Sequence, residues 1–150
     1  MSEPIYFFKM HTQWQGKRRG TLSSPALPDL PFCTPPEFNG EAGFWTPEHL
    51  FVAAAESCLM ATFLGIAENS GLRVVSYQST STGRLERVEG SGLGFTEITI
   101  HPIVELESAG DHEKAGRIMA KAHKGCLIAN SMAVLLHVEP QFSVRVPVAA

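Results

Sequence analysis

The feature that most constrains this 150-residue sequence is the apolar run from Leu50 to Ala67, within the stretch WTPEHLFVAAAESCLMATFLG. Its 18 residues lie close to the lower length limit of a membrane-spanning helix. Glu56 in the middle of the run and the frequent alanines argue against a lipid-facing helix. Since a helix that is apolar on every side must be covered by protein or lipid, the run predicts a buried helix of a soluble protein.

Both ends of this helix carry recognisable residues. Thr46 is a good N-cap, Pro47 suits the first helical position, and Glu48 lies in the first turn, where the helix dipole favours an anion. At the other end Asn69 or Gly71 can adopt the left-handed conformation that ends a helix. The sequence therefore predicts one long helix that begins after Thr46.

The remaining segments predict strands and one further helix. We expect early strands with a turn at residues 16–20, a β-hairpin formed by residues 73–88 and 93–106, an amphipathic helix at residues 111–124 and a half-buried strand at residues 136–146. Pro102, inside the second hairpin strand, suggests a sheet edge or a bulge. This order predicts an α+β fold in a single domain of residues 1–150.

Charge and cysteine content narrow the class of protein. The net charge is −3 and the basic residues are scattered apart from Lys17, Arg18 and Arg19, so we expect no nucleic-acid partner. The three cysteines do not have the spacing of a disulfide scaffold or a zinc site, and the histidines form no metal-ligand pattern. The first residues lack a signal-peptide pattern, so we expect a cytoplasmic protein that does not enter a membrane.

Each cysteine by itself permits a simple structural interpretation. Cys58 on an apolar helix is most readily explained as core packing, and Cys33 lies in a proline-rich loop with no charged partner. Cys126 follows Gly125 at a junction between helical segments, where N–H groups of the next helix could stabilise a thiolate. His123 precedes Cys126 by three residues, but the glycine between them is expected to separate the two side chains.

Three motifs together are more specific. The segments TPEHLFVAAAESC, KAHKGCLIANS and GKRRGTLSS resemble, in order and spacing, the signatures of the OsmC/Ohr family of osmotically inducible and organic hydroperoxide resistance proteins. The resemblance implies antiparallel sheets around a long buried central helix, in an intertwined two-fold homodimer. It also implies that Cys58 is the peroxidatic cysteine, Cys126 the resolving cysteine and Glu48 the carboxylate that holds an arginine. The family pattern Arg-x-Gly-Ser/Thr favours Arg18 for that arginine, with Arg19 as the alternative.

The implied chemistry is a thiol-dependent reduction of a small organic hydroperoxide. A free thiol with a pKa of about 8.5 is mostly protonated at neutral pH, so a peroxidatic Cys58 needs a neighbouring cation, which an arginine held by Glu48 would supply. Cys58 would become a sulfenic acid and then form a disulfide with Cys126. No bound cofactor or metal is required, but an external dithiol, of lipoyl type or another kind, must reduce the disulfide.

Helix geometry adds an expectation about the dimer. Glu48 and Cys58 are ten positions apart, about 15 Å along a helix axis, so Glu48 and its arginine should serve Cys58 of the other subunit.

Two other functions remain open. One is an OsmC-fold binding or stress protein without efficient peroxidase turnover, and the other is a cysteine hydrolase that uses Cys126 with a histidine.

Overall fold

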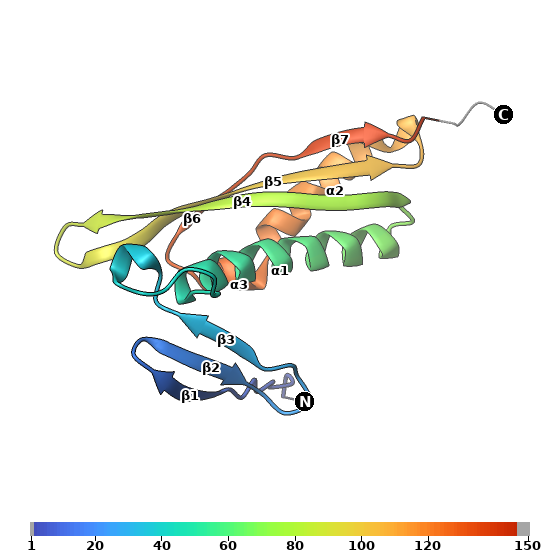
Figure 1. Ribbon diagram of the computed structural model, residues 1–150. Helices are drawn as coiled ribbons and strands as arrows, with labels where there is room; N and C mark the ends of the chain where they lie inside the picture. Colours follow the sequence, from blue (N-terminus) through green and yellow to red (C-terminus); the bar gives the residue numbers. More distant parts are fainter. Residues whose placement is uncertain (1, 147–150) are drawn as a thin grey trace. The chain divides into compact units, whose positions relative to one another are not determined.

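The computed structural model describes residues 2–146. The chain forms two units, residues 1–51 and residues 52–150, and helix α1 (Pro47–Asn69) begins in the first unit and continues into the second. The strands, helices and short 3-10 helices (η) that accompany α1 are, in chain order, β1 (His11–Gly16), β2 (Arg19–Ser23), β3 (Leu30–Cys33), η1 (Pro36–Phe38), β4 (Val74–Val88), β5 (Gly92–Leu106), η2 (Ala109–Asp111), α2 (His112–Gly125), α3 (Leu127–Asn130), β6 (Leu135–Val138) and β7 (Gln141–Val144) (Figure 1).

The N-terminal unit contains an antiparallel sheet of three strands in the order β1-β2-β3. The turn between β1 and β2 has positive φ angles of 102° at Gly16 and 49° at Lys17, which confirms the turn predicted there. Gly20 on β2 is buried, and a Cβ atom at this position would lie 2.7 Å from the ring of Phe32 on β3. A glycine at this position therefore allows β2 and the Phe32 side chain to approach closely.

The predicted ends of the long helix are confirmed by its hydrogen bonds. Thr46 Oγ1 accepts a hydrogen bond from the backbone N–H of His49 at 3.0 Å, as expected for an N-cap residue. At the C-terminus the N–H of Leu72 donates to the carbonyl oxygen of Ala67 at 2.9 Å, and Gly71 has a φ of 71°. This is a Schellman motif, so the glycine is required by the left-handed backbone that ends α1.

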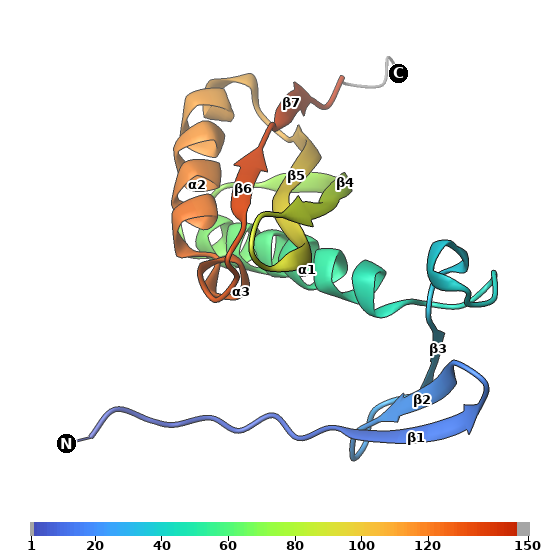
Figure 2. The ribbon, with the colours of Figure 1, turned by 90° about the vertical axis from the view of Figure 1, so that its left-hand side faces the viewer.

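The C-terminal unit packs helices against a mixed four-stranded sheet (Figures 1 and 2). Alternate residues of β5 are buried, and so is one stripe on each of the two longer helices, as expected for elements that share one core. A Cβ atom on Gly83 of β4 would lie 2.4 Å from the side chain of Val52 on α1, so the helix passes close to the strand. The main core residues of this unit are Ala55, Leu59, Phe63, Ala67, Ile98, Ile100, Val104, Leu106, Ala115, Ile118, Met119 and Ala122.

The expectation of an edge or a bulge at Pro102 is wrong, because β5 is a central strand. It pairs antiparallel with β4 on one side, and on the other side in parallel first with β6 and then with β7. The β6 pairing ends opposite Ile100 and the β7 pairing begins opposite Ile103. Pro102 lies in the gap between these two pairings. Its lack of an N–H therefore costs no hydrogen bond of the sheet.

The C-terminal segment also differs from the prediction in one respect. The sequence predicted one strand over residues 136–146, whereas the structure has two short strands, β6 and β7, separated by Glu139 and Pro140. Both retain the expected half-buried alternation, but Val146, the last residue of the predicted strand, is 81% exposed. The predicted amphipathic helix is present as α2, and the helical turn expected after Cys126 is α3.

Helix α1 is only partly covered by its own chain. It is long and apolar enough to cross a membrane, a test that the core helix of a soluble protein also meets, yet only 22% of its apolar window is buried. The fully buried side chains form one stripe, which consists of Ala55, Leu59, Phe63 and Ala67. The rest of this apolar helix therefore presents a surface that one chain alone does not bury.

Candidate active site

Cys58 lies in the middle of α1 and is partly exposed. Its sulfur is 3.9 Å from the hydroxyl oxygen of Thr62, one helical turn further on. That hydroxyl donates its single hydrogen to the carbonyl oxygen of Cys58 at 2.7 Å. Thr62 therefore contacts the thiol, and its hydroxyl is one of the groups that lower the pKa of Cys58.

Cys126 lies between α2 and α3, at the point where Gly125 ends α2. It has an extended backbone, with φ −67° and ψ 100°, and serves as the residue that precedes α3. Its side chain is fully buried, and its sulfur is 4.0 Å from the carbonyl oxygen of Ala55 on α1. The break between α2 and α3 thus directs this thiol toward α1.

The two thiols act on each other and have opposite pKa shifts. Burial raises the pKa of the Cys58 thiol, but nearby donors outweigh this effect and lower the pKa. These donors are the N–H of Ile128, the Cys126 thiol, the Thr62 hydroxyl and the N–H of Leu127. Burial and the adjacent Cys58 sulfur raise the pKa of Cys126, and they outweigh the N–H groups of Ala129 and Ile128, which lower it. The pair therefore favours a thiolate at Cys58 beside a protonated donor at Cys126.

The N–H groups of α3 act on both sulfurs. Those of Ala129 and Ile128 lower the pKa of Cys126, as expected for N–H groups that follow this cysteine, although burial outweighs them. Those of Ile128 and Leu127, in the first turn of α3, also lower the pKa of Cys58. The sequence holds no indication of this, because it depends on how α3 packs against α1.

The predicted carboxylate and arginines belong to the N-terminal unit. Arg18 donates to the carbonyl oxygen of Phe38 at 3.2 Å, and Arg19 pairs with Glu41 at 3.1 Å. Glu48 Oε2 is buried and has no hydrogen-bond partner among residues 2–146. The expected pair between Glu48 and Arg18 is therefore not formed in this single chain.

The other candidate groups have structural roles. Cys33 is buried, and its sulfur accepts the N–H of Glu41 at 3.4 Å. His123 contacts the carbonyl oxygen of Leu136 at 2.9 Å, and in the part of the chain that the structure describes no histidine bonds to Cys126. Residues 2–146 contain no cluster of three histidine, cysteine or acidic side chains able to hold a metal ion.

A polar cluster between α1 and β4 was missed by the sequence analysis. Both oxygens of Glu56 accept hydrogen bonds at 2.6 Å, one from Ser79 and one from Ser81 on β4. The nearby Tyr77 hydroxyl is buried and has no partner within residues 2–146, and burial together with the charge of Glu56 raises its pKa to about 12. The cluster ties α1 to β4 two residues before Cys58, so it helps to position the thiol.

The fold and the site together define a class: an α+β protein whose central helix and a helix junction bring two free cysteines together. The profile of the family described as OsmC-like protein matches residues 40–139, which include both cysteines. The chain belongs to this OsmC-like family.

Individual relatives agree with this membership. YmaD of Bacillus subtilis (strain 168), an uncharacterized protein, is 26% identical over 145 residues, covering 93% of this chain and 95% of YmaD. An OsmC-like protein of unknown function from Vibrio cholerae has a TM-score of 0.85 at 23% identity, covering 91% of this chain and all of that chain (100%). An organic hydroperoxide resistance protein from Legionella pneumophila has a TM-score of 0.72 at 23% identity, covering 93% of this chain and 100% of that one. These structures share the fold.

Proposed function

We propose that this protein is a cytoplasmic, cysteine-based reductase of organic hydroperoxides that acts as a homodimer. The observation that carries the proposal is the cysteine pair, in which Cys58 has a lowered pKa and Cys126 a raised one. Thiolate character at the partly exposed sulfur and a second thiol beside it are the two requirements of a peroxidase that forms an internal disulfide. Fold relatives that are organic hydroperoxide resistance proteins support the same activity.

The proposed reaction has two steps. The Cys58 thiolate attacks one peroxide oxygen, so that an S–O bond forms and the O–O bond breaks, and the leaving alkoxide takes up a proton to become the alcohol. Cys126 then attacks the sulfenic sulfur of Cys58, an S–S bond forms, and hydroxide leaves with the Cys126 proton as water. The sulfur has lost two electrons to the peroxide, and an external dithiol, of lipoyl type or another kind, returns them. No bound cofactor takes part.

The second subunit is proposed to complete the site. Glu48 Oε2 is buried without a partner within residues 2–146, and it would hold Arg18, or Arg19 in its place, against Cys58 of the other subunit. The arginine would then stabilise the negative charge that develops on the peroxide oxygens. The uncovered apolar surface of α1 supports a dimer, because a second copy would bury it.

Intact-mass analysis after one equivalent of cumene hydroperoxide tests the proposal. The wild-type chain should lose two hydrogens as the Cys58–Cys126 disulfide forms. Cys58→Ser should remain unoxidised, whereas Cys126→Ser should retain a Cys58 sulfenic acid that dimedone traps. Cys33→Ser is the matched control and should behave as the wild type does.

If Cys58 does not react with the hydroperoxide, the proposed peroxidase activity is refuted. The alternative, an OsmC-fold binding protein without efficient peroxidase turnover, would then be favoured. Acylation of Cys126 by an activated ester, with no response to hydroperoxide, would point to the hydrolase instead. Size-exclusion chromatography with light scattering tests the dimer separately. A monomer that keeps full activity would contradict the shared site.

A further inference from the structure

Helix α2 carries a line of cations along one side, which we call the α2 basic face. It consists of Lys114, Arg117, Lys121 and Lys124. At 100° and 1.5 Å per residue these side chains fall within an arc of about 80° and span about 15 Å. The whole chain has 12 lysines and arginines and a net charge of −3, so a third of its cations are concentrated on one helix face. Glu113 is the one acidic residue within α2 and lies at its beginning.

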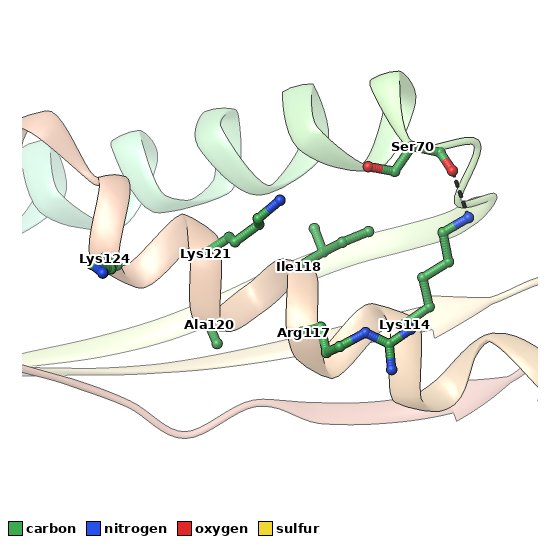
Figure 3. A pocket seen from close by; sticks show the side chains of 7 residues that line it. All are labelled: Ser70, Lys114, Arg117, Ile118, Ala120, Lys121 and Lys124. Atoms are coloured by element: carbon green, nitrogen blue, oxygen red, sulfur yellow. Dashed lines mark hydrogen bonds between the residues drawn. The ribbon is translucent and has the colours of Figure 1, made fainter.

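The α2 basic face borders a groove of about 560 Å³ whose lining also includes Ser70, Ile118 and Ala120. Figure 3 shows Lys114 and Lys121 reaching toward α1. The ammonium group of Lys114 donates to the carbonyl oxygen of Ser70, just beyond the C-terminus of α1, which fixes one end of the groove. The groove therefore combines apolar lining with a positively charged border.

The other cations of this face have no acidic partner in the part of the chain that the structure describes. Within residues 2–146 no ion pair involves Arg117, Lys121 or Lys124, although Arg73 and Arg84 of the sheet region each pair with a glutamate. Like charges three and four positions apart on a helix repel each other and lower its stability. An anionic partner along the groove would remove this repulsion, and a row of charges about 15 Å long fits a chain of several anions better than a single ion.

We propose that the α2 basic face docks an acidic segment of the protein that carries the reducing dithiol. This inference rests on the proposed function. Helix α2 ends at Gly125 and Cys126 follows directly, so a protein bound along α2 is held next to the disulfide that it must reduce. One thiolate of the partner attacks the disulfide, a mixed disulfide forms, and the second partner thiol displaces it. Cys58 and Cys126 regain their thiols, and the partner leaves as a disulfide.

Binding can be measured without any peroxide. The probe is a fluorescein-labelled oligoglutamate of about ten residues, about 15 Å long if helical, titrated with the full chain and followed by fluorescence anisotropy. The triple variant Arg117→Gln, Lys121→Gln, Lys124→Gln should weaken binding by at least about tenfold at low salt. It leaves the Lys114 hydrogen bond in place, so α2 should remain folded, which circular dichroism checks.

A matched control removes the same charge elsewhere. Arg84→Gln, Arg87→Gln, Arg145→Gln should change oligoglutamate binding by less than about twofold, because these three residues lie outside α2 and none of them lines the groove. Equal weakening in both triple variants would overturn the proposal in favour of a diffuse charge effect. Absence of binding to the wild type would also overturn it, as would binding to vesicles of anionic phospholipid in preference to the peptide.

A kinetic measurement then tests the role of the face in reduction. The Cys58–Cys126 disulfide, prepared with diamide, is reduced by a peptide that contains Cys-Gly-Pro-Cys and a glutamate tail, and by the same peptide with a glutamine tail. We expect a KM lower by about tenfold for the glutamate peptide, lost in the α2 triple variant, with reduction by dithiothreitol unchanged. Equal KM values for the two peptides would refute the docking. Since diamide replaces peroxide, failure of the peroxidase itself would not affect this result.

Discussion

The N–H groups of α3 that lower the pKa of Cys58 can be removed one at a time. Leu127 is the first residue of α3, and its N–H is among the groups that lower the pKa of Cys58. Proline lacks an N–H but is well tolerated at the first position of a helix. Cys126, the residue before it, already has the extended conformation that precedes proline, with ψ 100°. Leu127→Pro should therefore delete one donor and keep α3.

The size of the effect follows from the energy of one hydrogen bond. A net contribution of about 0.5–1 kcal/mol corresponds to a rise of about 0.4–0.7 units in the pKa of Cys58. At a pH below the pKa of Cys58, the thiolate fraction should fall by about two- to fivefold. The side chain of Leu127 is 65% exposed, so its loss should change the packing little.

The assay is the rate of iodoacetamide alkylation at Cys58 as a function of pH, quantified on the peptide that contains Cys58 by mass spectrometry. Leu127→Ala is the matched control, because it shortens the same side chain and keeps the N–H. The apparent pKa should rise in the proline variant and stay within about 0.2 units of wild type in the alanine variant. An unchanged pKa in Leu127→Pro, with α3 intact by hydrogen exchange, would refute the assignment of this N–H to the thiolate.

Three further predictions concern the same unit. Cys126→Ala should raise the pKa of Cys58 by about 0.7 units, whereas Cys126→Ser keeps a hydroxyl donor and should raise it less, by the same alkylation assay. Because Tyr77 titrates near pH 12 in the folded protein and near 10 when unfolded, its stabilisation is present below pH 10 and lost as pH rises to 12. That loss is about 1–2 kcal/mol after allowing for partial solvent screening, and denaturant titrations should show it in the wild type and not in Tyr77→Phe. Gly83→Ala should lower the free energy of unfolding by about 1–3 kcal/mol in the same titrations, because its methyl group would collide with α1; an unchanged value would show that α1 moves aside freely.

Local patterns predicted the elements that depend on local interactions. The start and end of α1 follow from Thr46, Pro47 and Gly71, and the β4–β5 hairpin follows from its turn residues and alternation. The neighbours of β5 could not be predicted in this way, because β6 and β7 pair with it across about forty residues of intervening chain. Pro102 was misjudged for the same reason, since its place between two partner strands is set by non-local pairing.

The candidate site, like the fold, could be predicted from the sequence only in part. The pairing of Cys58 with Cys126 came from the resemblance between motifs, and the structure brings these two thiols together. The roles of Arg18 and Glu48 stay predictions, because they depend on a second subunit. The cluster around Glu56 was not predicted, since a glutamate on an apolar helix does not indicate which serines of a distant strand will bond to it.

The position of Cys126 explains how two chemically identical thiols acquire different roles. As the residue before α3, it lies where the first N–H groups of that helix act on both sulfurs, and those of Leu127 and Ile128 lower the pKa of Cys58. Full burial keeps its own thiol protonated, and a protonated thiol can donate a hydrogen bond to the Cys58 thiolate. In this unit the lowered pKa of Cys58 thus arises from N–H and S–H donors without any cation. An arginine reaching Cys58 from a second subunit would therefore act chiefly on the charge that develops on the peroxide during attack, rather than on forming the thiolate.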